Sequence, residues 1–530
     1  MTGTRRTMLL QALALAGWLA AGLAGGAAGA QEAPGAAVTP AAEAPAPDAA
    51  PTLTLLFAIG VVQVEPSPSV ASVPQLAAFV ARERAEGRPV LFLHGGNSVV
   101  GNWLSALDRG RHMVALLNLL GTDAMSLGHW EFAGGLEALR ARAAEARFPL
   151  VATTVRDAAT GRPPEGVVAS VMLEAGGVKV GVLSATHPDL FRLVMPTTGL
   201  AFADPVEAVG EAAAALRRDG ADLVVLATPV AGGQNARLAE AGAADILLHY
   251  DSRGIDLPVH RRTAKGLEIG LAQRSSYGVA IDIRAARGEG GAFTWTPAVR
   301  AVDLTVEVPD AAAMAHVDAL VESRRAELDA PVVRLMDAMD TRTRQVRTRE
   351  NGFANLVADA LRERLRADAA LIGSGAIRGT RLYPADTVMT RRDLLVELPL
   401  GNAAVLIEVT GAQLRAALEH AVADPKVATG RFPQVSGMRL SFDLSRPPGS
   451  RLTSAEVAGR TLDDAASYRL ATMDFLAGGG DGHAALAQGR PLAVDGAGQP
   501  VEAIVRDFLA ARRQVVPAVD GRIAVAGGGR

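Results

Sequence analysis

The sequence predicts an α/β protein built from two domains. The chain has 530 residues, which is more than one hydrophobic core usually holds. From Thr52 to about Asp303, short apolar runs alternate with amphipathic runs of helical spacing, which is the pattern of an α/β sandwich. A second series of strand and helix patterns extends from about Thr348 to Val525, and we expect a second α/β domain there.

The elements of the first domain follow from their apolar periodicity. Continuous or alternating apolar residues predict strands at residues 53–64, 89–94, 222–228, 267–284 and 293–306. Apolar residues three and four positions apart predict helices at residues 73–86, 111–120 and 205–219. Between residues 171 and 184, the pair Gly176-Gly177 separates two apolar runs, which predicts a hairpin.

The connection between the domains is expected to be helical. Residues 311–327 have helical spacing but many charges and no obvious core of their own, so we interpret them as a connecting helix. The predicted boundaries are 52–305 for the first domain, 306–347 for the connection and 348–525 for the second domain.

The N-terminus predicts export. Arg5 and Arg6 precede an apolar run that ends in small residues suited to cleavage, so we interpret residues 1–30 as a signal peptide. The stretch 4–9 is similar to a twin-arginine signal, which would imply export to the periplasm in the folded state. Residues 31–51 are rich in Ala and Pro and are expected to form a linker. A retained membrane anchor is the alternative to cleavage.

Composition excludes several classes of partner and chemistry. The formal net charge is −3, so the chain has no basic excess for nucleic acid, and we expect no nucleic-acid partner. It has no cysteine, which excludes disulfides, thiol catalysis and thiolate metal sites. After the signal peptide, no stretch is long and apolar enough to span a membrane, so no membrane association is expected once the signal is cleaved.

A glycine-rich stretch near the C-terminal end has the residue types of a nucleoside site. Residues 468–475 predict a strand that leads into Gly478-Gly479-Gly480, where the backbone can approach a ligand closely. Asp481 follows Phe475 six residues later, and such a pair offers a ring for the base and a carboxylate for the ribose. The alternative is a tight turn with a solvated Asp and a core Phe.

This stretch, Phe-Leu-Ala-Gly-Gly-Gly-Asp-Gly at residues 475–482, resembles the F-L-A-x-G-G-D-G signature of the 5'-nucleotidase family, which includes UDP-sugar hydrolases. Four more motifs of that family's C-terminal domain occur in the right order, at residues 351–356, 375–378, 398–402 and 430–437. The resemblance implies that the second domain is a 5'-nucleotidase C-terminal domain and that its partner is a nucleotide or nucleoside. The sequence identifies no protein partner.

By this resemblance, five residues would form the binding site. Phe432 and Phe475 would hold the base between their rings, Asp481 would bind the ribose, and Gly480 belongs to the loop between them. Arg378 would meet phosphate, since a guanidinium suits a pair of charged oxygens. The alternatives are that Phe432 is a core residue and that Arg378 is a solvated surface charge.

The first domain resembles the metallophosphoesterase domain of the same family, best at residues 113–132. The resemblance implies a four-layer αββα sandwich. Members of the family use two divalent metals (Mn, Zn or Co), bound through Asp, Asn and His, to activate water and to hold the phosphoryl oxygens.

The family's metal-binding positions are substituted in this chain. The D-x-H motif has become Gly60-Val61-Val62, and the G-D pair has become Gly95-Gly96. Trp130 and Ala133 stand in place of the catalytic His and its Asp. The other ligand positions fall near residues 228–229 and 249–252. We therefore assign no catalytic residue and expect no metal cofactor.

A residual mononuclear metal site is an alternative. Its candidate ligands are His94, His129, His249 and Asp251, all expected near strand ends. Isolated histidines at such places are more often structural residues with hydrogen bonds. The segment 128–132, Gly-His-Trp-Glu-Phe, also resembles the Sox B hydrolase of thiosulfate oxidation, a relative with two manganese ions.

The sequence thus predicts an exported member of the 5'-nucleotidase family with a degenerate metal site, acting as a nucleotide-binding pseudoenzyme. The family hydrolyses phosphoric esters in nucleotide catabolism, so activity is left open. One alternative is a working phosphoesterase with a rebuilt metal site. Another is an accessory protein of sulfur oxidation, like Sox B.

Overall fold

The structure is a computed structural model that describes residues 50–67, 70–186, 199–228, 233–251, 258–272, 276–288, 291–424 and 429–527. Residues 48–530 form one compact unit. The predicted signal peptide and nearly all of the predicted linker lie outside the described residues. Among the helices that are described, none is long and apolar enough to cross a membrane.

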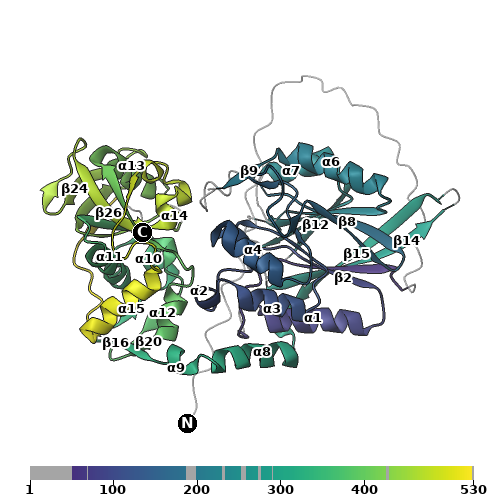
Figure 1. The fold of residues 1–530 in the computed structure, drawn as a ribbon, viewed down its shortest axis with the longest axis horizontal. Helices are drawn as coiled ribbons and strands as arrows, with labels where there is room; N and C mark the ends of the chain where they lie inside the picture. The colour runs from purple at the N-terminus through teal and green to yellow at the C-terminus, as the bar shows by residue number, and fades with distance from the viewer. Residues whose placement is uncertain are drawn as a thin grey trace, which may run out of the picture. The chain divides into compact units, whose positions relative to one another are not determined.

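The first large sheet has seven strands, of which β2, β14 and β15 are labelled in Figure 1. Its order is β15 (Phe293–Asp303), β14 (Tyr277–Arg287), β1 (Leu53–Ala58), β2 (Val90–His94), β3 (Ala124–Ser126), β4 (Leu150–Val151) and β6 (Val167–Val168). Strands β1, β2 and β3 are parallel, so their carboxyl ends meet at one edge of the sheet.

The second sheet has six strands. Its order is β12 (Val259–Thr263), β13 (Gly266–Ala272), β11 (Ile246–Asp251), β10 (Leu223–Thr228), β8 (Val178–Ser184) and β7 (Ser170–Ala175). A core of Leu and Val side chains from both sheets, including Leu55, Leu93, Val180 and Val225, lies between them. Burial of this shared face holds the two sheets together.

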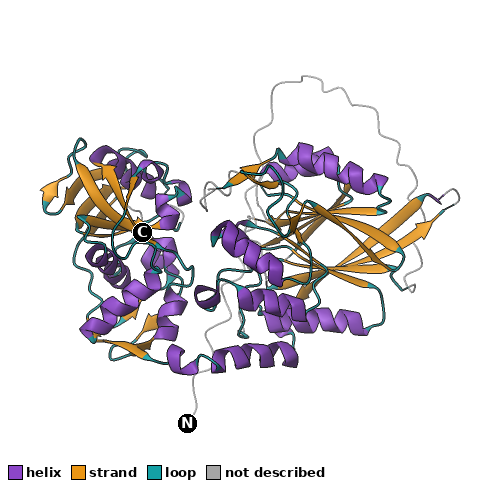
Figure 2. Ribbon diagram, viewed as in Figure 1, coloured by secondary structure: helices purple, strands orange, loops and turns teal. Residues whose placement is uncertain are grey.

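Helices cover the outer faces of both sheets (Figures 1 and 2). The first sheet packs on α1 (Val73–Ala85), α3 (Arg111–Leu119), α4 (Gly135–Glu145) and α8 (Ala311–Glu322). The second sheet packs on α6 (Pro205–Arg218) and α7 (Gly233–Ala241). The layers therefore run helix, sheet, sheet, helix, as predicted.

The C-terminal half is built on a five-stranded sheet. Its order is β22 (Pro433–Ser436), β18 (Ala369–Gly373), β26 (Ser467–Met473), β21 (Ala404–Thr410) and β27 (Arg490–Leu492). Helices α11 (Gly352–Arg364) and α15 (Val501–Arg512) belong to one core beside this sheet, and α13 (Gly411–Ala421) belongs to another. Smaller sheets join β20 (Val388–Thr390), β16 (Pro331–Leu335) and β28 (Gln514–Val515), and β25 (Arg460–Thr461), β24 (Leu452–Val457), β23 (Met438–Asp443) and β29 (Ile523–Ala526).

Several predicted elements are wrong in their limits. The strand predicted at 53–64 ends at Ala58, because Gly60 has a φ of 67° and turns the chain out of the sheet. The strand predicted at 267–284 is two strands of different sheets, β13 and β14. The strand predicted at 468–475 ends at Met473, and residues 474–477 form the short helix α14.

The predicted connecting helix also differs from the structure. It is two helices, α8 and α9 (Arg325–Leu328), and Ala313, Val317 and Leu328 are buried in the core beside the first sheet. Charges on the exposed face masked this apolar stripe in the sequence. The boundaries predicted for the two domains stay predictions.

Candidate functional site

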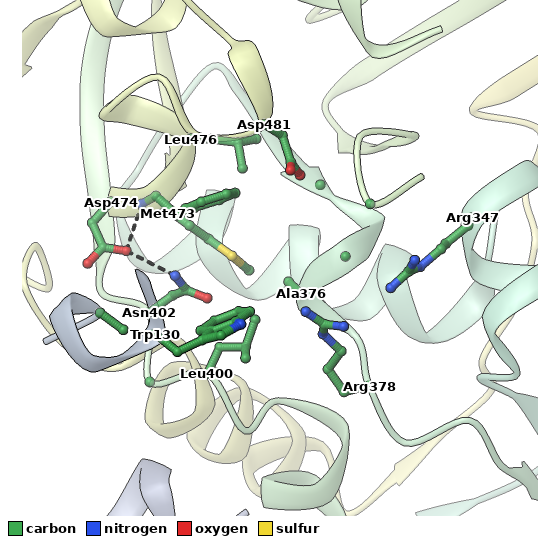
Figure 3. A pocket seen from close by; sticks show the side chains of 16 residues that line it. Trp130, Arg347, Ala376, Arg378, Leu400, Asn402, Met473, Asp474, Leu476 and Asp481 are labelled. Atoms are coloured by element: carbon green, nitrogen blue, oxygen red, sulfur yellow. Dashed lines mark hydrogen bonds between the residues drawn. The ribbon is translucent and has the colours of Figure 1, made fainter. Parts of the chain in front are cut away.

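A cavity of about 240 Å³ lies at the ends of the elements that carry the glycine-rich motifs (Figure 3). Its lining includes Arg378 after β18, Asp474 and Phe475 in α14 (Asp474–Ala477), and Asp481 in the loop that follows. Trp130, from the segment after β3, also lines it. The cavity thus combines ring faces with charges of both signs, which suits a polar aromatic ligand.

The loop that carries Arg378 is held by one buried carboxylate. The Arg378 N–H donates to the Glu397 carbonyl oxygen (2.8 Å), and the Gly379 N–H donates to Glu397 Oε2 (3.2 Å). A Cβ at position 379 would lie 1.9 Å from Glu397 Oε1, so this close approach requires glycine. Glu397 Oε1 also accepts hydrogen bonds from the hydroxyls of Thr341 and Tyr383, each at 2.9 Å.

Burial changes the acidity of Glu397 and Tyr383. Burial of Glu397 raises its pKa to about 7, although the hydrogen bonds from Thr341, Tyr383 and the Gly379 N–H lower the pKa. Burial and the nearby Glu397 raise the pKa of Tyr383, so this phenol remains a donor. The Arg378 loop is therefore anchored by a carboxylate that is poised to titrate near neutral pH.

The loop after α14 places Asp481 at the cavity. Gly479 and Asp481 both have positive φ, 88° and 53°, and a Cβ on Gly480 would lie 2.5 Å from the Phe475 ring. Gly480 is therefore the residue that lets the Phe475 ring pack against the loop. Burial raises the pKa of Asp481, while Arg431, Arg378 and Arg347 lower it.

The predicted aromatic pair lies in two environments. Phe475 is half-buried and lines the cavity, whereas Phe432 is 8% exposed and packs in the core with Leu371 and Val435. Phe432 is not among the described residues that line the cavity. The Trp130 ring lies there instead, with the Arg378 guanidinium carbon 6.0 Å from its centroid. That a base stacks between Phe432 and Phe475 stays a prediction.

The residues that sequence reasoning missed in the cavity include the polar side chains of Arg347, Asn402 and Asp474. Arg347, in α10 (Thr343–Thr348), lines it, and burial lowers the pKa of this guanidinium while Asp481 raises it. Arg347 is one of several arginines in residues 342–349, so spacing could not single it out. Asn402 and Asp474 also line the cavity and bond to each other, Nδ2 to Oδ1 at 3.3 Å (Figure 3).

The carboxyl ends of β1 and β2 carry no metal-binding side chains at the substituted positions. The Gly60 N–H donates to the Gly96 carbonyl (3.0 Å), and the Gly95 N–H donates to the Ala58 carbonyl (2.7 Å). Val61 and Val62 are buried beside them. Glycine and valine offer no donor atoms to a cation from their side chains, so these residues do not fit the family's two metals.

Glu131 fills the space between the two loops at this edge. Its Oε2 accepts hydrogen bonds from the N–H groups of Asn97 (2.9 Å) and Gly128 (2.8 Å). Its Oε1 accepts from the N–H groups of Ser98 (2.8 Å) and Val99 (3.2 Å). Burial raises the pKa of Glu131, and the four N–H groups oppose that rise. This carboxylate ties the loop after β2 to the segment after β3.

A further contact at this edge involves Gly96, which has a φ of 81°. A Cβ at position 96 would lie 2.4 Å from the Ser126 carbonyl oxygen and 2.9 Å from the Gly128 nitrogen. Both partners are backbone atoms, which cannot swing aside as a side chain could. The loop therefore accepts only glycine at this position.

The four residual metal candidates have separate surroundings. His94 accepts from the Gly96 N–H at Nδ1 and bonds Ser98 Oγ at Nε2, both at 3.1 Å, and burial lowers its pKa to about 4. Burial also lowers the pKa of His129 to about 4, and its Nδ1 has no hydrogen-bond partner in the described part of the chain. His249 bonds Glu268 (3.1 Å) on the neighbouring strand.

Asp251 ends β11, but its side chain lies outside the described residues. Across the described part of the chain, no three His, Asp or Glu side chains are grouped so that they could hold a metal. The residual site stays a prediction.

Comparison of the sequence with known proteins finds similarity to one family. The family model named 5'-nucleotidase, C-terminal domain, matches residues 330–488. A mouse 5'-nucleotidase is 24% identical over 507 residues, covering 86% of this chain and 85% of that protein. Residues 330–488 form a 5'-nucleotidase C-terminal domain, and the chain as a whole is similar to 5'-nucleotidases. The predicted family and fold class are thereby confirmed.

Solved structures share the fold of this chain. The 5'-nucleotidase precursor from Thermus thermophilus is 25% identical, with a TM-score of 0.69, and the match covers 90% of this chain and all of that one (100%). The sulfate thiohydrolase SoxB of Thermus is 20% identical, with a TM-score of 0.63, covering 91% of this chain and 98% of that chain. The second similarity is one of fold alone.

Proposed function

We propose that this member of the 5'-nucleotidase family binds a nucleotide or nucleoside and has lost the family's two-metal hydrolytic centre. The observation that carries the proposal is the contrast between two places in one chain. The cavity keeps Arg347, Arg378, Phe475 and Asp481, whereas glycine and valine occupy the metal positions at residues 60–62 and 95–96.

The cavity supplies one type of contact for each part of a nucleotide. A base would stack on Phe475, which is worth roughly 1–3 kcal/mol. A ribose hydroxyl would donate to the Asp481 carboxylate, a charge-assisted bond of about 1.5–3 kcal/mol. Phosphate oxygens would meet the guanidinium groups of Arg347 and Arg378. After the cost of association, these terms support affinity in the micromolar to millimolar range.

We further propose that the protein is exported to the periplasm. The supporting features are Arg5 and Arg6 before the apolar run of residues 1–30, and the Thermus relative is described as a precursor. Edman sequencing or mass spectrometry of the mature protein, expected to begin at Gln31, tests this proposal.

Binding is predicted to depend on different residues for a nucleoside and for its phosphate. Phe475→Ala should raise the Kd of adenosine and of AMP about tenfold, because the base loses its stacking partner. Arg378→Ala should raise the Kd of AMP by a similar factor and leave adenosine unchanged, because adenosine has no phosphate. Isothermal titration calorimetry measures both, with Arg490→Ala, on an exposed edge strand, as the control.

Two outcomes of that titration would contradict the proposal. The first is a wild-type protein that shows no saturation by adenosine or AMP at millimolar concentration. The second is an Arg378→Ala variant whose affinity for adenosine falls as much as its affinity for AMP. The arginine would then act on the fold of the loop and not on phosphate.

Protein purified without chelator should carry less than one equivalent of Mn, Zn, Fe or Co. It should also hydrolyse AMP, UDP-glucose and bis-p-nitrophenyl phosphate no faster than a buffer blank. Both expectations follow from the lack of metal-binding side chains at residues 60–62 and 95–96, and from Trp130 and Ala133 at the family's catalytic His and Asp. Elemental analysis and a phosphate-release assay test them. Metal-dependent turnover that disappears in His129→Ala would instead establish a rebuilt hydrolytic site.

A further inference from the structure

His420 makes a direct contact with the backbone of the Asp481 loop. This residue lies at the C-terminal end of α13, and its Nε2 is 2.8 Å from the Asp481 carbonyl oxygen. Because a carbonyl oxygen only accepts, the imidazole carries its hydrogen on Nε2 and donates it. The bond joins residues 61 positions apart in sequence, so it fixes the loop to a separate helix.

The peptide that accepts this bond is in an unfavourable conformation. Asp481 has a φ of 53° and lies between Gly479 (φ 88°) and Gly482 (φ 84°). The left-handed region disfavours every residue with a Cβ, although Asp tolerates it better than most. Such a conformation persists only where neighbouring contacts hold it in place.

His420 is itself held from a second side. The His483 ring lies edge-on to the His420 ring, with centroids 5.0 Å apart and an interplanar angle of 80°. His483 is 1% exposed, and its nitrogens have no hydrogen-bond partner in the described part of the chain, so it acts there as a packed apolar ring. The imidazole of His420 is thus fixed both by packing and by the bond that it donates.

We propose that His420 is a positioning residue that holds the Asp481 carboxylate toward the ribose of a bound nucleotide. The inference rests on the proposed function, because it assigns a role within the same site. His420 does not appear among the described residues that line the cavity, and it acts through the Asp481 backbone. Arg431, Arg378, Arg347 and His420 act on the same carboxylate by charge, and His420 in addition bonds the Asp481 carbonyl oxygen.

A positioning role predicts a selective effect. If His420 sets the direction of the Asp481 carboxylate, its loss should weaken only ligands with ribose hydroxyls. A general role in stability would weaken all ligands of the cavity alike. Adenosine and 2',3'-dideoxyadenosine form the matched pair of probes. They share the base, and only adenosine has the two ribose hydroxyls that could donate hydrogen bonds to a carboxylate.

The test is calorimetric titration of both probes into the full chain and its variants. His420→Ala should raise the Kd of adenosine about fivefold to tenfold, as for the loss of one net hydrogen bond, and should change dideoxyadenosine by less than twofold. His420→Gln, which keeps a side-chain N–H donor, should restore most of the affinity. On an Asp481→Ala background, His420→Ala should have no further effect. His316→Ala, on the exposed face of α8, is the control.

Hydrogen exchange of the ligand-free protein provides a readout that does not depend on binding. In His420→Ala, the amides of Gly482 and His483, bonded to Gly479 and Gly480, should exchange faster than in wild type. Equal weakening of both probes, unchanged adenosine affinity, or unchanged exchange in this loop would each overturn the proposal. If wild type binds neither probe, the proposed function fails, and the exchange rates alone decide whether His420 holds the loop.

Discussion

Replacing Glu131 by alanine should lower the free energy of unfolding by about 4 kcal/mol. The carboxylate is 4% exposed and accepts from four backbone N–H groups, which the variant would leave buried without an acceptor. Each unsatisfied buried donor costs about 1–3 kcal/mol, and relaxation or entry of water recovers part of the sum. Urea unfolding monitored by circular dichroism measures the change.

Two further variants make the Glu131 result specific. Glu131→Gln keeps the shape of the side chain but replaces one acceptor oxygen by an NH₂ group that faces backbone donors. Its free energy of unfolding should therefore lie between those of wild type and Glu131→Ala. Glu211→Ala removes an exposed carboxylate from α6 and should change stability by less than about 0.5 kcal/mol. A Glu131→Ala variant as stable as the Glu211 control would contradict the anchoring role.

The stability of wild type should fall, relative to Glu397→Gln, as the pH rises from about 4.5 to 7. Burial raises the folded-state pKa of Glu397 from 4.5 to about 7, so within this interval the folded protein binds the proton and the unfolded chain releases it. The contribution of the protonated Glu397 carboxyl to the free energy of unfolding is complete below pH 4.5 and is lost above pH 7. Its size is on the order of 3 kcal/mol.

The Glu397→Gln variant resembles the protonated carboxyl and cannot ionise. Unfolding by urea at pH 5 and at pH 8 should therefore show the wild type losing stability relative to the variant. The hydroxyls of Thr341 and Tyr383 can still donate to the amide oxygen, so the variant should fold. Two parallel stability profiles would show that Glu397 keeps an ordinary pKa in the fold.

The sequence predicted much of the fold because local signals agreed with the tertiary structure. Ser72 and Gln75 form a capping box at the start of α1, and Asp204 caps α6, so both predicted helices begin where expected. The failures came from properties that a local pattern does not contain. The run 267–284 contains two stretches rich in apolar residues on either side of residues 273–276, and nothing in it specifies that β13 and β14 belong to different sheets.

The candidate site was predictable only where motifs carried it. Asp481, Phe475 and Arg378 were found from their motifs, and all three line the cavity. Arg347 was missed because a tertiary contact, not spacing, distinguishes it from its neighbouring arginines. Phe432 was assigned to the site by its motif, and it packs in a core cluster, so its contact with a base stays a prediction.

The glycine at position 96 restricts which side chains this loop can carry. An aspartate there, as in the family's G-D pair, would need a Cβ where the Ser126 and Gly128 backbone atoms already lie, in a backbone conformation that disfavours it. The N–H groups of the same loop are committed to Glu131. An aspartate at this one position would therefore destabilise the fold before it could serve as a metal ligand, so the neighbouring backbone and Glu131 would have to change with it.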